Sequence, residues 1–194
     1  MTYDISAIVK IISPRAKNSF ALGISDSWNQ MIEIAQLTTV LRKCHFLAQC
    51  AKESDGFITT KEYASGIAYE FRKDLGNDIK GEGIRYKGAG IIQTTGHENF
   101  LQISKDLNFD FIKYPEKLQE FPYAALSAAY FWKKRINRLN AAADADDIEK
   151  VTRIVNGGLN GLKDRKIYLM RAKIAFEYKE KNDKITNTIR SAFI

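Results

Sequence analysis

The stretch TTVLRKCHFLAQCAKESDG, residues 38–56, decides the predicted fold because it reads as one long helix with an abrupt end. From Leu41 to Ala51, apolar residues recur at every third or fourth position, which is the spacing of one helix face. The triplet SDG at 54–56 ends this pattern, since Asp and Gly favour turns. Glu53 is therefore predicted to lie in the last helical turn, just before the chain changes direction.

The rest of the chain also reads as mainly helical. Further helices are predicted at residues 5–12, about 27–36, about 98–107, 148–155 and about 162–179. The stretch PYAALSAAYFWKKRI, residues 122–136, is apolar on nearly all sides, so we expect the central core helix here, with Trp132 in the core. In the last helix we expect Ile167, Met170 and Ile174 to face inward.

Two segments are predicted to lie outside the helices. The glycine-rich region 76–96 contains IRYKGAGIIQTT, whose β-branched residues favour a small β-hairpin or short sheet. The stretch AAADADD, residues 141–147, is expected to be a short acidic connection. The predicted fold class is therefore mainly α, with one small β element.

Length and composition favour one soluble globular unit. The chain has 194 residues, 45% of them hydrophobic and 27% charged, and no linker marks a boundary, so we expect a single domain over residues 1–194. The longest apolar run, residues 124–132, is far shorter than the roughly 20 residues of a membrane span. We therefore expect no stable membrane insertion, and we expect a monomer.

The chain is basic, with a formal net charge of +7, and the surplus is concentrated between residues 163 and 194. This balance favours an anionic partner, which is nucleic acid, acidic lipid or an anionic cell-wall polymer. No helix-turn-helix, RNA-binding or zinc signature accompanies the charge. We therefore expect no nucleic-acid partner.

The cysteines and histidines indicate neither a disulfide nor a metal site. Cys44 and Cys50 share one predicted helix but point to different sides, as expected of small buried residues in a reducing compartment. His45 and His97 have no cysteine or carboxylate at metal-ligand spacing. Residues 1–20 lack the basic n-region of a signal peptide. We expect a protein of the cytoplasm without a metal or cofactor.

Glu53 and Glu62 are nine residues apart, so one continuous helix would place them on opposite sides. A turn at Gly56 removes this problem, because it lets Glu62 return across a cleft from Glu53. The partial negative charge of a helix C-terminus favours the protonated carboxyl that a general acid needs, whereas a more solvated Glu62 suits a general base. Two such carboxyls are the working groups of glycoside hydrolysis, although spacing alone is more typical of two solvated surface acids.

Four sequence blocks extend this interpretation. They are HFLAQCAKESDGF at 45–57, KEYASGIAYEFRKDLGN at 61–77, GIRYKGAGIIQTTGHENF at 83–100 and VTRIVNGGLNGLKDR at 151–165. In order and spacing, the blocks resemble family 19 glycoside hydrolases, specifically the chitinase-like lysozymes of bacteriophages and prophages. The resemblance covers roughly residues 38–175 and implies a lysozyme-like helical domain, with its small β element beside an active-site cleft, and an inverting mechanism.

The resemblance implies Glu53 as the general acid and Glu62 as the general base. It implies that Gln93 contacts the sugar and that Thr95 helps to hold the attacking water. Further cleft positions implied by the resemblance are Asn99, Asn156 and Arg165. Structural alternatives stay open, because Asn156 also fits a helix C-cap, Arg165 a structural partner for an acid, and Gln93 a polar strand residue.

Two residues depart from the family pattern. Lys52 stands where the family usually has histidine, and we expect its side chain to point to solvent. Ala89 stands where the family usually has arginine, which removes an ion-pair partner near the cleft. Neither departure affects the two glutamates.

The predicted function is that of an endolysin, which cleaves β-1,4 bonds of bacterial peptidoglycan by general acid and general base catalysis. Such a protein would accumulate in the host or bacterial cytoplasm before its release to the cell wall. The alternatives are a chitinase that acts on N-acetylglucosamine polymers and a non-catalytic glycan-binding relative.

Overall fold

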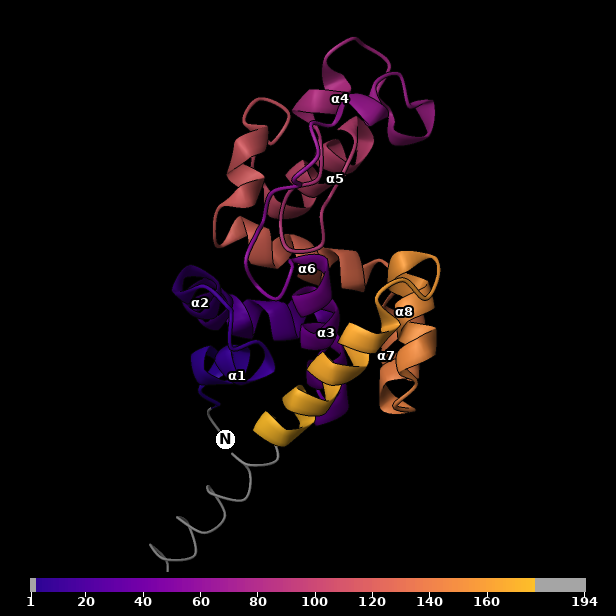
Figure 1. Ribbon diagram of the computed structural model, residues 1–194. Helices are drawn as coiled ribbons and strands as arrows, with labels where there is room; N and C mark the ends of the chain where they lie inside the picture. The colour runs from indigo at the N-terminus through magenta and orange to yellow at the C-terminus, as the bar shows by residue number, and fades with distance from the viewer. Residues whose placement is uncertain (1–2, 177–194) are drawn as a thin grey trace, which may run out of the picture.

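The computed structural model describes residues 3–176, which form a mainly helical protein (Figure 1). Its helices are α1 (Ile5–Ile12), α2 (Asn18–Ala35), α3 (Val40–Glu53), the 3₁₀ helices η1 (Ile67–Tyr69) and η2 (Lys73–Leu75), α4 (Glu82–Arg85), α5 (His97–Leu107), the 3₁₀ helix η3 (Pro115–Gln119), α6 (Tyr123–Lys133), α7 (Ile136–Asp144) and α8 (Ile148–Asn156). A last helix begins at residue 162 and continues to residue 176, the end of the described chain. None of these helices combines the length and apolar character needed to cross a bilayer.

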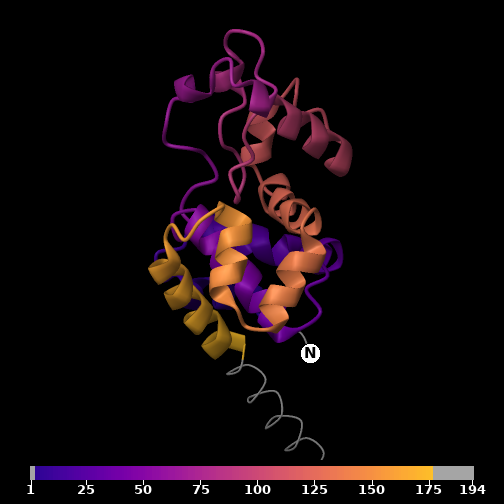
Figure 2. The ribbon, with the colours of Figure 1, turned by 90° about the vertical axis from the view of Figure 1, so that its right-hand side faces the viewer.

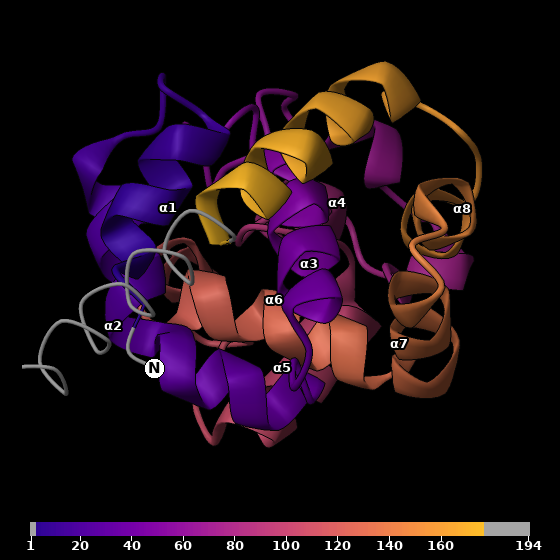
Figure 3. The same cartoon turned by 90° about the horizontal axis from the view of Figure 1, so that it is seen from below.

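The helices form two lobes, which Figures 1 and 2 show one above the other. The larger lobe contains α1, α2, α3, α7, α8 and the last helix, and the smaller lobe contains α4 and α5 with the surrounding loops. Helix α6 lies between them and contacts α2, α5 and α7. Seen from below, the last helix crosses α3 (Figure 3). The two lobes have separate hydrophobic clusters.

Helix α3 begins and ends as the sequence predicts. Thr39 caps its N-terminus by accepting a hydrogen bond from the Arg42 backbone N–H at 3.1 Å. At the other end, Gly56 adopts a φ of +74° and donates to the Ala51 carbonyl at 2.7 Å. This positive φ suits glycine and turns the chain away directly after Glu53. Residues 44–51 are all buried, so α3 is a central helix rather than a one-sided surface helix.

Helix α6 is the second central helix. Its side chains from Ala124 to Ala129 are buried, and the indole of Trp132 is fully enclosed. The Trp132 indole N–H donates to the Asn140 amide oxygen at 2.8 Å, which satisfies its polar atom. The predicted core position of Trp132 is confirmed.

Two predicted boundaries are wrong. Helix α2 begins at Asn18, well before residue 27. Gly23 lies inside this helix and allows a close approach of Phe121, since a Cβ atom at Gly23 would lie 2.2 Å from Cγ of Phe121. The predicted acidic connection at 141–147 is largely helical, since α7 continues to Asp144. Asp144 pairs with Arg42 of α3 at 2.5 Å, which holds the end of α7 in place.

The predicted hairpin is replaced by isolated pairings. In residues 3–176 no strand of a hairpin forms, and Ala89 instead makes single antiparallel bridges to Lys61 and to Thr94. The backbone turns sharply between Ala89 and Thr94, with positive φ at Gly90 and Gln93, so the pairing does not continue into this turn. The loop is anchored on a small core that includes Tyr86.

The predicted inward face of the last helix is also wrong. Met170 and Ile174 are each 54% exposed, whereas Leu169, Ala172 and Phe176 are buried. Arg165 lies on the same buried face as Leu169 and Ala172, and its guanidinium points into the protein toward Glu53 of α3. The predicted end of this helix at Lys179 lies outside the described residues.

Candidate active site

Arg165 joins the last helix to the end of α3. Its side chain is 1% exposed, and its Nη2 donates to Oε1 of Glu53 at 2.6 Å. Nη1 donates to the amide oxygen of Gln49, and Nε donates to the Asn160 carbonyl at 3.2 Å. Gln49 and Glu53 are four residues apart on α3, so they share one face of the helix. Each guanidinium nitrogen of Arg165 therefore has an acceptor.

Glu53 keeps partial access to solvent, since its side chain is 20% exposed. The buried guanidinium supplies a full positive charge beside it, which opposes the electrostatic effect of the helix C-terminus. Within residues 3–176, the hydrogen bond of Glu53 is made by Oε1, and no donor contacts Oε2. One oxygen is thus held and the other remains open to a substrate.

The sequence predicts that the Lys52 side chain points into solvent, but the structure shows it in an ion pair. Its Nζ lies 2.7 Å from Oδ2 of Asp164, and the two side chains are 34% and 50% exposed. The aliphatic part of Lys52 packs closely over Gly161, where an added Cβ would meet Cε at 2.2 Å. The ammonium is therefore engaged by Asp164. That ion pair lowers the pKa of Asp164, chiefly through the hydrogen bond from Lys52.

Glu62 is held by two donors from the smaller lobe. The Tyr69 hydroxyl donates to Oε1 at 2.7 Å, and the Gly88 backbone N–H donates to Oε2 at 2.8 Å. The Glu62 backbone N–H in turn donates to the Gly88 carbonyl at 3.0 Å. The hydrogen bond to Glu62, with burial, raises the pKa of Tyr69. These contacts fix the orientation of the carboxylate.

Gln93 lies beside Glu62. A Cβ atom added to Gly88 would lie 2.7 Å from Oε1 of Gln93 and 2.9 Å from Oε2 of Glu62. Gln93 has a φ of +54°, which is rare for a residue with a side chain, and its amide donates to the Gly90 carbonyl at 2.8 Å. This strained position aims its amide oxygen toward the same space as Glu62.

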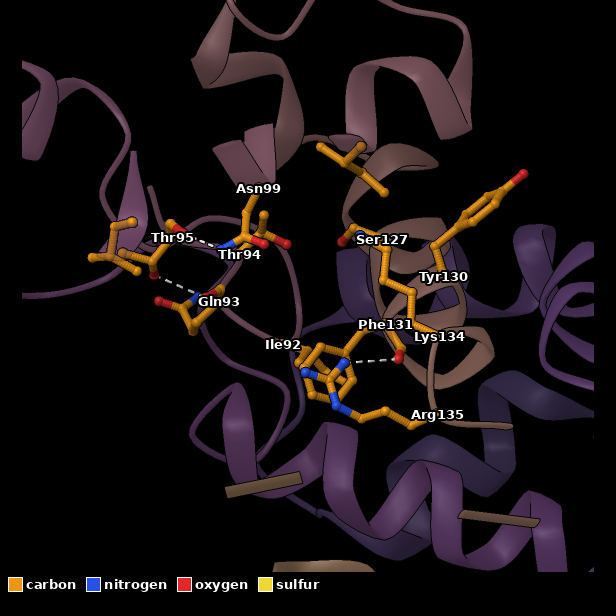
Figure 4. A pocket seen from close by; sticks show the side chains of 12 residues that line it. Ile92, Gln93, Thr94, Thr95, Asn99, Ser127, Tyr130, Phe131, Lys134 and Arg135 are labelled. Carbon is orange, nitrogen blue, oxygen red and sulfur yellow. Dashed lines mark hydrogen bonds between the residues drawn. The ribbon is translucent and has the colours of Figure 1, made fainter. Parts of the chain in front are cut away.

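Thr95 and Asn99 follow Gln93 along one pocket (Figure 4). The Thr95 hydroxyl donates to the Gln93 carbonyl at 3.0 Å, and the Asn99 amide donates to the Thr95 carbonyl at 2.8 Å. The pocket has a volume of about 240 Å³ and is closed on its other side by α6. Three of the predicted substrate-binding residues, Gln93, Thr95 and Asn99, therefore line one cavity.

Asn156 does not join these residues. It is the last residue of α8, it is exposed, and Gly157 follows it with a φ of +78°. This is the geometry of a helix C-terminus, as the structural alternative for Asn156 describes. Within the described chain no hydrogen bond connects Asn156 to either glutamate or to the pocket.

Three residues that hold the site were not identified from the sequence as site residues. They are Gln49, Tyr69 and Gly88. Gln49 gave one usable signal, since it precedes Glu53 by one helical turn in an otherwise apolar segment. Gly88 gave none, because it acts through its backbone.

The buried cysteines and the metal-ligating side chains form no further centre in the part of the chain that the structure describes. Cys44 and Cys50 are fully buried, and burial raises the pKa of the Cys50 thiol. Across residues 3–176, no three side chains of His, Cys, Asp or Glu are grouped closely enough to hold a metal ion.

Similarity to known proteins indicates the family to which the chain belongs. No family model matches the sequence. A glycosyl hydrolase family 19 domain-containing protein of Haemophilus influenzae is 30% identical over 178 residues, which cover 75% of this chain and 86% of that protein.

Solved structures show the same fold. Chitinase C from Streptomyces griseus HUT6037 superposes with a TM-score of 0.69 at 16% identity, over 90% of this chain and 77% of that chain. A bacterial family 19 chitinase superposes with a TM-score of 0.63 at 15% identity, over 88% of this chain and 93% of that chain. The identity and extent of the match to the Haemophilus protein, together with these two structural similarities, show that the chain belongs to glycoside hydrolase family 19.

Proposed function

We propose that this protein hydrolyses β-1,4 bonds in the glycan strands of bacterial peptidoglycan, with Glu53 as general acid and Glu62 as general base. The observation that supports the proposal most directly is the different support of the two carboxyls. Glu53 is held through one oxygen by the buried Arg165, whereas both oxygens of Glu62 accept hydrogen bonds from Tyr69 and Gly88. Two carboxyls in different surroundings suit different roles in proton transfer.

In the proposed reaction, Oε2 of Glu53 gives a proton to the oxygen of the leaving sugar. Glu62 takes a proton from a water molecule, which attacks the anomeric carbon from the opposite face of the ring. Gln93, beside Glu62, orients the acetamido sugar, and the Thr95 hydroxyl helps to hold the water. Inversion requires room for that water, corresponding to a carboxyl separation of roughly 6.5 to 9.5 Å in the substrate complex.

The net charge of +7 supports peptidoglycan as the substrate, because its peptides carry free carboxylates, as do lactyl groups that have lost their peptide, whereas chitin is neutral. On this proposal the protein acts as a monomeric endolysin that is made in the cytoplasm and later reaches the wall. The alternative substrate is chitin, which the names of the similar solved structures favour. A third possibility is a glycan-binding relative without turnover.

The test is digestion of purified sacculi, followed by mass spectrometry of the released muropeptides. We expect soluble fragments with a new reducing end, and proton NMR at early times should show the inverted anomer. Glu53→Gln should lower the rate by about a hundredfold to ten-thousandfold, the usual contribution of general acid catalysis. Glu149→Gln is the matched control, since Glu149 is half-exposed and pairs with Lys166 on the surface. Intact sacculi after incubation with the unmodified protein would contradict the proposal.

A further inference from the structure

The pocket that contains Gln93 and Asn99 also has a basic wall. Lys134 and Arg135, in the turn between α6 and α7, line the same cavity (Figure 4). An uncharged polymer of N-acetylglucosamine offers hydroxyl and amide groups but no anion. Two cations in a sugar pocket therefore raise the question of which negative group they meet.

Arg135 is held in place without a carboxylate partner. Its Nη1 donates to the Phe131 carbonyl at 3.3 Å, and its Cζ lies 4.0 Å from the centroid of the Phe131 ring. Burial and the neighbouring Arg138 lower the pKa of Arg135. Over residues 3–176, no carboxylate lies within ion-pair distance of its guanidinium. Arg42 and Arg165, by contrast, each bind an acid.

This arrangement leaves donors available. A guanidinium carries five N–H groups in a rigid plane, and stacking on Phe131 orients that plane before any ligand arrives. One backbone carbonyl occupies a single nitrogen. Partial burial strengthens the attraction for an anion, because less water competes for the charge.

Lys134 plays a weaker part. Its Nζ lies 3.9 Å from Oδ2 of Asp106, at the limit of an ion pair, and its side chain is 43% exposed. Asp106 thus partly offsets the charge of Lys134, whereas among residues 3–176 no ion pair offsets that of Arg135. Arg135 is the stronger candidate for an anionic ligand.

We propose that Arg135 binds a carboxylate of the muramic acid side chain, and that this contact makes the pocket selective for peptidoglycan over chitin. The inference rests on the proposed function and deepens it, because it assigns the choice of substrate to one residue. The carboxylate belongs either to the lactyl group or to the attached peptide, which share the same chemistry. A planar guanidinium can hold such a group by two parallel hydrogen bonds.

The experiment compares four substrates. They are peptide-bearing glycan strands, strands stripped of peptide by an amidase, stripped strands whose lactyl carboxylates are converted to methylamides, and chitin oligosaccharides. The variant Arg135→Gln removes the charge, and Arg135→Lys keeps the charge without the planar fork. Arg153→Gln is the matched control, because Arg153 is exposed and does not line the pocket.

We expect Arg135→Gln to lower kcat/KM by about tenfold to a hundredfold on strands with the recognised carboxylate, the usual effect of losing a charge-assisted hydrogen bond. Arg135→Lys should lose less. On methylamide strands and chitin oligosaccharides, Arg135→Gln should match the unmodified protein. A loss on stripped strands alone assigns the lactyl carboxylate, and a loss on peptide-bearing strands alone assigns the peptide. Arg153→Gln should leave all four rates unchanged.

Equal losses on all four substrates would overturn the inference, since Arg135 would then only support the fold. No loss on any substrate would overturn it as well. Binding of the same strands, measured by calorimetry in a Glu53→Gln background, separates this inference from the proposed function. If binding depends on the carboxylate and Arg135→Gln abolishes it, the inference is supported even if the unmodified protein cleaves nothing. If binding is the same with and without the carboxylate, the inference is refuted even if cleavage is fast.

Discussion

Nη2 of Arg165 lies 2.6 Å from Oε1 of Glu53, although the two residues are 112 positions apart in the chain. The guanidinium is enclosed by the protein, and the carboxyl is partly open. A buried charge is costly unless it is paired and its hydrogen bonds are satisfied. The position of the candidate general acid is therefore tied to the docking of the last helix on α3.

Gln49 should stabilise the protein through Arg165. Gln49→Leu removes the amide oxygen that accepts from Nη1, so a buried donor loses its partner. We expect the free energy of unfolding to fall by about 2 kcal/mol and the melting temperature by about 4 to 8 °C. The control is Gln102→Leu, because Gln102 is exposed and bonds Asp106 on the same helix. Equal melting temperatures for the two variants would contradict the role of Gln49.

Tyr69 should orient Glu62. Tyr69→Phe removes the hydroxyl that donates to Oε1 at 2.7 Å while keeping the ring. We expect kcat/KM on peptidoglycan to fall by about tenfold, corresponding to the loss of one hydrogen bond to a charged group. Tyr63→Phe makes the same chemical change at an exposed hydroxyl that bonds Asp55, and it should leave the rate unchanged. Equal rates for the two variants would show that Tyr69 does not support the base.

Gly88 should be intolerant of a side chain for functional reasons. Its added Cβ would lie 2.7 Å from Oε1 of Gln93 and 2.9 Å from Oε2 of Glu62, so both side-chain ends would have to leave their present positions. We expect Gly88→Ala to fold with nearly unchanged melting temperature but to lose most activity. Gly158→Ala is the control, because nothing lies within 4 Å of its added Cβ. An active Gly88→Ala protein would mean that Glu62 need not occupy its present position.

His45 should make folding stability depend on pH. The ring is fully buried, and its Nε2 lies 2.9 Å from Oδ1 of Asp146, which also binds Lys173. Burial lowers the pKa of His45 below its ordinary value of 6.5, although Asp146 opposes the shift. The unfolded chain therefore binds a proton more readily than the folded protein just below pH 6.5, so stability is present above this pH and is lost as the pH falls.

Urea unfolding at pH 7.5 and 5.5 checks this dependence. One proton is involved, so the slope cannot exceed about 1.4 kcal/mol per pH unit. His45→Gln should flatten the curve in this interval. Asp146 titrates at a lower pH than this interval, because the hydrogen bonds from Lys173 and His45 outweigh the effect of its burial and lower its pKa. A wild-type curve as flat as that of His45→Gln would refute the assignment.

Local sequence signals predicted the parts of the fold that depend on neighbouring residues. The helix at 5–12 and the end of α3 at Glu53 are confirmed, because capping and turn residues lie within a few positions. The predicted hairpin near Ala89 is wrong, because β-branched residues favour extended backbone but here flank a tight turn, with positive φ at Gly90 and Gln93, that leaves only the single bridge from Ala89 to Thr94. The β propensity described the individual residues, but it did not predict the turn at Gly90 and Gln93.

The sequence by itself determined that Glu53 lies at the end of a helix, because the turn at Ser54 and Gly56 ends that helix. Only the tertiary structure decided which partners the two glutamates have. The last helix could have presented its apolar residues Met170 and Ile174 to the core, yet it turns Arg165 inward instead. The buried face carries Arg165 beside the apolar residues Leu169 and Phe176, and the buried charge has its acceptors on α3, a long-range pairing that local spacing does not reveal.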